Sequence, residues 1–491
     1  MLRTVLLSLA LLLVGNFLLA QDGYEIKVKL NGFTESEILL ANYYGDKQYI
    51  KDTVQMNPNG YFVFKGEEAL EPGVYLIVMP PENQFLQVMI NKGEQHFMVE
   101  TDVKDPVNGF KSKNTADNEL FYNYLKFLGE QRIKGEALKK RLEEASAADK
   151  PALEKEMEIV NQAVRDRQRK LVDNNPNSVT KMMIQSGVEP EAPKFDLKGD
   201  ELKRKNFEFY KKHWFDNYEM GNPAMLRSPG LHRRIDYYVN KMTLQHPDSV
   251  AVSVDYVLEL LSPSEESFKY YVVHFLNEAA KSKIVGMDAL YVYIVEKYYM
   301  TGKAKWTEEE QLNKIIKNAK TLMPILVGKI APDIKMQLLD VEETIKAKEV
   351  ENAHKRVKTK GMMTLHEVKS PYTVLFFWDP DCGHCKKSMP KLLEFYDKFK
   401  PRGVEVFAVC TRTYKEVPAC AQMIKDKGMT KWINVVDPYL KSKFKITYDV
   451  RTTPQIFVLD EKKEIISKRI GAEQLEELME RILTTPPPAK E

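Results

Sequence analysis

The sequence contains few cysteines: four in 491 residues, with none in the first 381 positions. Small exported folds that rely on disulfides have a much higher density of cysteine, so the stability of this chain must come from hydrophobic cores. All four cysteines lie between positions 382 and 420, and two of them form the motif C-G-H-C at residues 382–385. Such a close pair needs an explanation other than structural cross-linking.

An excess of charge of either sign is also absent, since 73 basic and 70 acidic side chains give a net charge of +3. No long basic block is interleaved with aromatic residues, and we therefore exclude nucleic acid as a partner. The proportion of hydrophobic residues is typical of soluble globular domains. The length of the chain predicts about three of them.

Long apolar runs are missing after position 20, so we expect no transmembrane segment in the mature chain. Residues 1–20 differ in character: Arg3 precedes an apolar run over residues 5–14, and Ala20 ends the segment before a polar stretch. This pattern is typical of a cleaved secretory signal peptide. An uncleaved membrane anchor is the alternative, although the run is short for a span of about 20 residues.

Residues 21–110 are predicted to form an all-β domain. In the stretch YEIKVKL, at residues 24–30, apolar and charged side chains alternate as they do in a strand with one face in water. Turn signals at residues 57–60 and 72–73 precede further β-rich runs. Short strands at this spacing favour a small antiparallel sandwich, whose role the sequence does not indicate.

Residues 111–323 are predicted to form an all-α domain, because apolar residues recur at intervals of three and four among many Lys and Glu. Aromatic stripes in this region, such as FEFYKKHWFDNY, are more typical of a helical core than of a ligand platform. Its histidines lack the spacing of a metal-binding helix face. At the other end of the chain, residues 484–491 (TTPPPAKE) are predicted to be a disordered tail.

Residues 324–483 are predicted to form an α/β domain. Apolar runs at residues 372–379, 404–410 and 455–460 alternate with helical segments such as 386–400. Strands that are apolar on both faces indicate a sheet with a parallel core. The predicted fold class is therefore multidomain, with an N-terminal all-β sandwich, a central all-α domain and a C-terminal α/β domain.

The C-G-H-C motif lies between a buried strand and a predicted helix that begins around Cys382. Unpaired N–H groups and the helix dipole at this position favour an anion, and a thiolate is the anion that cysteine forms. We predict that Cys382 is the nucleophile and that Cys385, one turn later, resolves a mixed disulfide. His384 would supply positive charge or a hydrogen-bond donor beside the thiolate.

Nearby charges act on this thiol in both directions. Asp379 and Asp381 oppose its ionisation, whereas Lys386 and Lys387 favour it. We expect the pKa of the first thiol to lie below about 8.5.

Three other uses of the motif have to be weighed. A four-cysteine zinc site would need Cys410 and Cys420, but these are ten residues apart and not a second close pair. Covalent haem attachment requires histidine directly after the second cysteine, where this chain has Lys386. A purely structural disulfide across two residues gains little loop-closure entropy. We therefore predict neither a metal nor a cofactor.

The stretch VLFFWDPDCGHCKKSMPKLLEFYDKF resembles the active site of the thioredoxin fold, with Trp378 before the motif, Gly383 within it and Pro390 five residues after its second cysteine. Further on, YDVRTTPQIFVLDEKKEII resembles the strand of that family that begins at a cis-proline. The resemblance implies that Thr453 and Pro454 lie opposite the cysteines and are joined by a cis peptide bond, which is rare in proteins.

The distance in sequence between the motif and Pro454 exceeds the needs of a bare thioredoxin fold. It resembles the exported TlpA/ResA-like branch of the family, whose extra inserted element we expect around residues 411–437. The complete layout resembles exported Bacteroidetes proteins that have an N-terminal β domain, a helical middle and a C-terminal thioredoxin-like domain.

The chain departs from this family at two positions. Asp381 stands immediately before the first cysteine, where many members have tryptophan, and Phe376 occupies the position of the buried carboxylate of classical thioredoxins. Glu416, in the inserted element, is a candidate to replace that carboxylate in proton handling.

The second cysteine pair, Cys410 and Cys420, follows the next parallel strand. Cys410 is expected at the same edge of the sheet as Cys382, because the carboxyl ends of parallel strands meet there. A local structural disulfide or two unlinked buried thiols are the favoured interpretations, and a second relay pair is the alternative.

The resemblance implies an exported thiol–disulfide oxidoreductase in the periplasm of a Gram-negative bacterium. Its partners would be client proteins with cysteines or disulfides, which it would reduce. A membrane protein with reactive thiols would supply the electrons. The sequence C-G-H-C also suits an isomerase, so the direction stays open. The alternative from another class is an envelope ligand-binding or scaffold protein with a vestigial thioredoxin domain.

Overall fold

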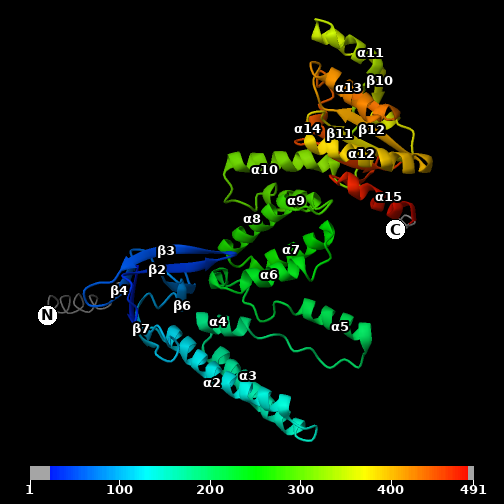
Figure 1. Ribbon diagram of the computed structural model, residues 1–491. Coiled ribbons are helices and arrows are strands. Elements are labelled where there is room, and N and C mark those ends of the chain that lie inside the picture. The colour runs from blue at the N-terminus through cyan, green and yellow to red at the C-terminus, as the bar shows by residue number, and fades with distance from the viewer. Residues whose placement is uncertain (1–22, 485–491) are drawn as a thin grey trace, which may run out of the picture. The chain divides into compact units, whose positions relative to one another are not determined.

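The structure is a computed structural model that describes residues 23–484, and Figure 1 shows the order of its elements along the chain. The predicted signal peptide, residues 1–20, lies outside the described residues, and so does all but the first residue of the predicted tail. The chain divides into two compact units. The first contains the described residues up to 243 together with 255–270, and the second contains 244–254 together with residues from 271 onwards.

The β region of the first unit consists of two four-stranded sheets, with strand orders β4-β1-β7-β8 and β3-β2-β5-β6. The predicted alternation is confirmed in β1, where Ile26 and Val28 are buried and Lys27 and Lys29 are not. The strands are β1 (Tyr24–Asn31), β2 (Glu37–Tyr44), β3 (Lys47–Gln55), β4 (Phe62–Gly66), β5 (Gly73–Met79), β6 (Gln84–Ile90), β7 (His96–Asp102) and β8 (Lys111–Lys113).

The expectation of a purely antiparallel arrangement is wrong for one strand pair. Strand β1 pairs with β7 in parallel, with Ile26 opposite Phe97, whereas the other pairs in the two sheets are antiparallel. Parallel pairing needs a long connection. The intervening strands β2 to β6 supply it here.

Helices of the first unit are bonded directly to this β region. Asn118 exchanges two hydrogen bonds of 2.8 Å with the backbone of Met89, and the hydroxyl of Tyr122 donates to the carbonyl of Gln87 at 3.0 Å. Helices wholly within the unit are α2 (Ala116–Glu144), α3 (Lys150–Asn174), α4 (Val179–Ser186), α5 (Gly199–Lys212) and α6 (Leu231–Asn240).

The later helices do not form a body with the earlier ones. The unit boundary falls inside α7 (Pro247–Leu261) and α8 (Glu265–Lys281), and α9 (Asp288–Ile294) and α10 (Glu309–Leu322) belong to the second unit. This division cuts through the helical segment, and its grouping as one domain over residues 111–323 stays a prediction.

The second unit contains a seven-stranded sheet of order β10-β9-β13-β12-β11-β14-β15. The predicted parallel core is confirmed, because β11, β12 and β13 run parallel, and the strands on both sides of this core are antiparallel to their neighbours. The strands are β9 (Lys335–Leu339), β10 (Thr359–Thr364), β11 (Tyr372–Trp378), β12 (Val404–Cys410), β13 (Ile433–Val436), β14 (Gln455–Leu459) and β15 (Ile465–Lys468).

Both faces of this sheet are buried, as the sequence predicted for its central strands. Along β11, Phe376 and Trp378 enter one hydrophobic cluster, and Leu375 and Phe377 enter another on the opposite face. Helical side chains complete these clusters. The helices here are α11 (Val341–Lys346), α12 (Gly383–Phe399), α13 (Val417–Lys427), α14 (Phe444–Thr447) and α15 (Leu475–Thr484).

A buried lysine bonds the sheet to the preceding helical segment. Lys468, 1% exposed at the end of β15, forms an ion pair with Asp288 at the start of α9 and donates to the carbonyl of Ile325 at 2.7 Å. In residues 23–484, no helix has the length and apolar character that a bilayer span requires.

Candidate active site

The first cysteine lies where β11 gives way to α12. The strand ends at Trp378, and Cys382 is the N-cap residue of the helix, as the sequence predicted. The intervening turn is closed by hydrogen bonds from the N–H groups of Asp381 and Cys382 to the side chain and the carbonyl of Asp379, at 2.8 and 3.2 Å. The sulfur is thereby held beside the first turn of the helix.

The sulfur of Cys382 accepts a hydrogen bond from the backbone N–H of Cys385 at 3.2 Å and lies 3.1 Å from the carbonyl oxygen of Thr453. Burial alone would raise the pKa of this thiol. Interactions with the side chains of Cys385 and Thr453, and with the backbone of Cys385 and His384, outweigh burial and lower the pKa below its ordinary value. Cys382 is therefore the more easily ionised thiol of the pair.

The second thiol has the opposite properties. Cys385 is fully buried, and burial, followed by its interaction with Cys382, raises its pKa to about 12. It keeps its proton at neutral pH. One half-exposed thiol that ionises, beside one buried thiol that does not, is an arrangement suited to attack by the first and later displacement by the second.

The residues between the cysteines contribute less than the sequence suggested. The side chain of His384 is exposed, and it is the backbone of His384 that lowers the pKa of Cys382. A Cβ added at Gly383 would meet no atom within 4 Å, so space does not require glycine there. The lowered pKa of Cys382 comes first from the side chains of Cys385 and Thr453, and then from the backbone of Cys385 and His384.

The Thr453–Pro454 peptide bond is cis and immediately precedes β14, which is the antiparallel neighbour of β11. The structure thus brings Thr453 next to Cys382, as the family resemblance implied. Two residues that the family resemblance singled out lie on either side of the C-G-H-C motif. Trp378 is fully buried at the end of β11, and Pro390 lies inside α12.

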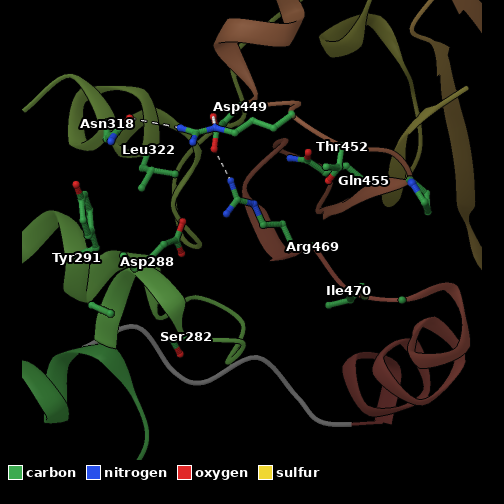
Figure 2. A pocket seen from close by; sticks show the side chains of 15 residues that line it. Ser282, Asp288, Tyr291, Asn318, Leu322, Asp449, Thr452, Gln455, Arg469 and Ile470 are labelled. Atoms are coloured by element: carbon green, nitrogen blue, oxygen red, sulfur yellow. Dashed lines mark hydrogen bonds and ion pairs between the residues drawn. The ribbon is translucent and has the colours of Figure 1, made fainter. Parts of the chain in front are cut away.

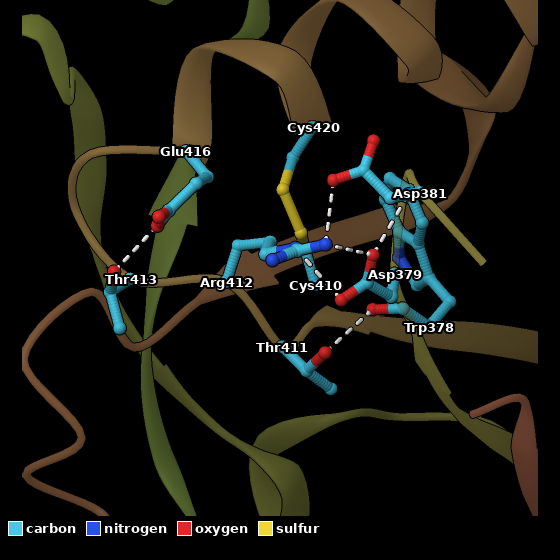
Figure 3. Close-up of a disulfide and its surroundings, with 9 residues drawn as sticks. All are labelled: Trp378, Asp379, Asp381, Cys410, Thr411, Arg412, Thr413, Glu416 and Cys420. Carbon is cyan, nitrogen blue, oxygen red and sulfur yellow. Dashed lines mark hydrogen bonds and ion pairs between the residues drawn. A yellow bond between two sulfur atoms is a disulfide. The ribbon is translucent and has the colours of Figure 1, made fainter. Parts of the chain in front are cut away.

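The other two cysteines form a disulfide between Cys410, the last residue of β12, and Cys420 in α13 (Figure 3). Both residues are buried, and Cys410 is directly opposite Trp378 in the sheet register. In this state their sulfurs are bonded to each other and cannot complete a four-cysteine zinc site. The disulfide joins β12 to α13 within the segment 411–437, where the inserted element was expected.

Sequence analysis did not identify Arg412, which lies two residues after Cys410 and thus between the two disulfide cysteines. Its guanidinium forms ion pairs with Asp379 at 2.8 Å and with Asp381 at 2.6 Å (Figure 3). It thereby offsets the two carboxylates that were expected to oppose ionisation of the thiol. The available signal was that Asp379 and Arg412 follow two neighbouring parallel strands, whose carboxyl ends meet at one edge of the sheet. Trp378 and Cys410, the last residues of these strands, are opposite each other in the register.

Glu416, the residue that the sequence suggested for proton handling, is hydrogen-bonded to a threonine. Glu416 accepts a hydrogen bond from the hydroxyl of Thr413 at 2.6 Å (Figure 3). Cys382, Thr453 and the backbone of Asp379 are the groups that act on the thiol of Cys385 besides burial. The position of the classical carboxylate, Phe376, is fully buried in the core. A role for Glu416 in proton transfer therefore stays a prediction.

A sheet with a parallel core and a cysteine at the start of the helix that follows one of its central strands are features of a thioredoxin-like fold. Comparisons with known proteins agree. The Redoxin family matches residues 327–483, and a domain of unknown function (DUF4369) matches residues 24–121.

Two curated relatives are similar over the same C-terminal region. Sporulation thiol-disulfide oxidoreductase A of Bacillus subtilis is 34% identical over 116 residues, which is 23% of this chain and 68% of the relative. Thiol-disulfide oxidoreductase ResA of Bacillus cereus is 32% identical over 124 residues, or 24% of this chain and 67% of the relative. The chain therefore belongs to the TlpA/ResA-like family of thioredoxin-fold thiol–disulfide oxidoreductases.

Two solved structures are also similar to the chain. A domain of a possible thiol-disulfide isomerase from Cytophaga hutchinsonii is 34% identical, with 33% of this chain and 95% of that chain covered and a TM-score of 0.27. A thioredoxin-like protein from Bacteroides caccae is 15% identical, with 61% and 98% covered and a TM-score of 0.45.

Proposed function

We propose that this protein exchanges a Cys382–Cys385 disulfide with cysteines of client proteins and acts as a reductant after export. The asymmetry of the two thiols carries this proposal. Cys382 is accessible and its pKa is lowered, whereas Cys385 is buried with a pKa of about 12. A nucleophile and a resolving thiol require this difference.

In the proposed first step, the thiolate of Cys382 attacks one sulfur of a client disulfide. A bond forms between Cys382 and the client, the client's own S–S bond breaks, and the second client sulfur leaves as a thiolate that takes a proton from water. Donors that stabilise negative charge on Cys382, the N–H of Cys385 among them, hold the attacking sulfur in place.

In the proposed second step, Cys385 loses its proton and attacks the sulfur of Cys382. The intramolecular disulfide forms, the mixed disulfide breaks, and the first client sulfur leaves as a thiolate and is protonated. Two electrons have then passed to the client. The interaction of Cys385 with Cys382 holds the resolving thiol next to the bond that it must break.

Export and the electron source belong to the same proposal. Residues 1–20 have the pattern of a signal peptide, and we place the mature protein in the periplasm. A membrane protein with reactive thiols would return two electrons to the Cys382–Cys385 disulfide after each cycle. Residues 23–323 carry no predicted part of the chemistry.

A variant that traps clients tests this function. With Cys385→Ser, the mixed disulfide on Cys382 cannot be resolved, so clients should accumulate as covalent adducts that dithiothreitol releases. The matched control is the double variant Cys382→Ser/Cys385→Ser, which should trap nothing. Reduction of insulin by dithiothreitol should also be faster with the unaltered protein than with Cys382→Ser. Equal rates would favour a scaffold.

The direction of electron flow has its own test. Equilibration with glutathione gives the reduction potential of the Cys382–Cys385 pair. A reductant should lie near the value of thioredoxin, about −270 mV, whereas a protein disulfide isomerase lies near about −180 mV. A value close to the isomerase's would overturn the reductant assignment and leave the exchange chemistry intact.

A further inference from the structure

A cavity of about 670 Å³ lies in the second unit, beside the cis-proline (Figure 2). Thr452, Pro454 and Gln455 line one side of it. Thr453, between these residues, has its carbonyl oxygen 3.1 Å from the sulfur of Cys382. The cavity therefore begins one residue from the backbone group that touches the nucleophile.

The opposite wall of the cavity comes from the helical segment, outside the residues matched by the Redoxin family. Asp288, Tyr291 and Asn318 lie on that wall (Figure 2). Lys468 fixes the wall against the sheet, because its buried ammonium is ion-paired with Asp288 and bonded to the carbonyl of Ile325. Moving this wall away from the sheet would leave a buried charge without its partner, which is energetically costly.

Four charged residues line this cavity: Asp288, Asp449, Arg451 and Arg469. Asp449, 10% exposed, accepts hydrogen bonds from Arg451 and from Arg469, each at 2.7 Å. The side chains of the two arginines are 67% and 43% exposed, respectively. Since Lys468 already neutralises Asp288, the group of Asp449, Arg451 and Arg469 leaves one positive charge in excess at the cavity.

The two guanidinium groups retain capacity for a further acceptor. A guanidinium carries five N–H donors in a planar fork. Arg469 uses one nitrogen for Asp449, and Arg451 uses one for Asp449 and a second for Asn318, at 3.4 Å. Exposed arginines that are held by a carboxylate and keep spare donors suit the planar carboxylate of a peptide.

We propose that this cavity receives the part of a client polypeptide next to its reacting cysteine, and that Arg451 and Arg469 select clients with a carboxylate there. This inference rests on the proposed function and names the substrate class of the same site. The carboxylate would come from Asp or Glu side chains within a few residues of the cysteine. The helical segment, which supplies the far wall, thereby contributes to substrate selection.

Two synthetic peptides test the proposal. Each has a single cysteine that carries 2-nitro-5-thiobenzoate as a mixed disulfide, flanked on both sides by Glu in one peptide and by Gln in the other. Attack by Cys382 joins the protein to the peptide and releases the coloured thiolate, so the second-order rate constant is read directly. At low salt, the reduced protein should react about threefold to fivefold faster with the Glu peptide.

Variants of the charged group should change this preference in opposite directions. Arg469→Gln should slow the reaction of the Glu peptide and leave the Gln peptide unaffected. Asp449→Asn removes the competing carboxylate and should enlarge the preference. Arg402→Gln, which breaks an exposed ion pair with Glu480 outside the cavity, is the matched control for the net charge of the protein and should leave the preference unchanged.

Equal rates for the two peptides with the unaltered protein would overturn the inference, and so would an equal loss for both peptides in Arg469→Gln. The inference would also be overturned if Arg402→Gln lowered the preference for the Glu peptide as much as Arg469→Gln does. The preference would then be an effect of the protein's net charge. Failure to react with 5,5′-dithiobis(2-nitrobenzoate), which has no peptide part, would instead overturn the proposed exchange function. The two failures are thereby distinguishable.

Discussion

The two cysteine pairs follow neighbouring parallel strands, yet their surroundings differ. The first pair, Cys382 and Cys385, is reduced in the structure and begins a helix, with one sulfur half-exposed. The second pair, Cys410 and Cys420, is oxidised and both of its residues are buried. Both pairs lie at the same edge of the sheet, so a position at this edge does not by itself make a thiol reactive.

Two local features separate the pairs. The sulfur of Cys382 accepts a hydrogen bond from the N–H of Cys385 at the start of a helix, which favours a thiolate that solvent can reach. Cys410 is the last residue of the buried strand β12, and its sulfur is bonded to that of Cys420 in α13. We therefore propose exchange chemistry for the first pair and a structural role for the second.

The largest effect is expected from removing the first sulfur. Cys382→Ser should lower disulfide reduction to the uncatalysed background, because no other described thiol is both accessible and easily ionised. The double variant Cys410→Ala/Cys420→Ala should keep most of the activity at temperatures where it is folded. The measurement is the rate of insulin reduction, and loss of activity in the second variant would contradict the assigned roles.

The second prediction concerns the pH dependence of alkylation. Because the pKa of Cys382 is lowered, its thiolate fraction at neutral pH exceeds that of a free cysteine, whose pKa is about 8.5. Its labelling rate with iodoacetamide should reach half-maximum at a lower pH than that of free cysteine. Cys385, with a pKa of about 12, should remain unlabelled over this range. Mass spectrometry of the reduced protein distinguishes the sites.

If Cys382 reacts at pH 7 no faster than free cysteine, the proposed nucleophile is wrong. Labelling of Cys385 before Cys382 would reverse the two roles.

The third prediction tests the second pair as a structural cross-link. Its cysteines are ten positions apart, so Cys410→Ala/Cys420→Ala should lower the free energy of unfolding of the second unit by about 2–3 kcal/mol. Urea denaturation measures this change. Cys382→Ala, at a half-exposed free thiol, is the control and should change it by less than about 0.5 kcal/mol. Equal losses would contradict the distinction between the pairs.

The smallest effect is expected at Arg412. Arg412→Gln leaves Asp379 and Asp381 without their counter-charge, and a negative charge near a thiolate raises its pKa. Alkylation of Cys382 at pH 7 should therefore slow by about twofold to threefold. Glu416→Gln, whose carboxylate accepts from Thr413, is the comparison variant and should leave the rate unchanged. A larger change in Glu416→Gln would favour the proton-handling role predicted from the sequence.

Local patterns predicted the features that local forces determine. The apolar run of β11 and the helix start at Cys382 were visible because strand burial and helix capping act over a few residues. The position of Thr453 beside Cys382 could not be derived in this way, because 71 positions separate these residues. It came from resemblance to a family.

Contacts that join distant segments were harder to predict, because their signal in the sequence is indirect. The parallel pairing of β1 with β7, and the ion pairs of Arg412 with Asp379 and Asp381, depend on how strands are ordered in a sheet. The division of the helical segment between two units has the same origin. Helical periodicity shows that a face is apolar but does not show which region covers it.

The buried ion pair of Lys468 bears on how the redox-active part of this chain can be isolated. The family match starts at residue 327, whereas the partners of the Lys468 ammonium are Asp288 and the carbonyl of Ile325. A truncation at the match boundary would keep the cation and discard both acceptors, and breaking a buried pair in this way costs about 3–5 kcal/mol. An excised fragment that begins ahead of Asp288 should therefore be the better starting point for crystallisation or labelling.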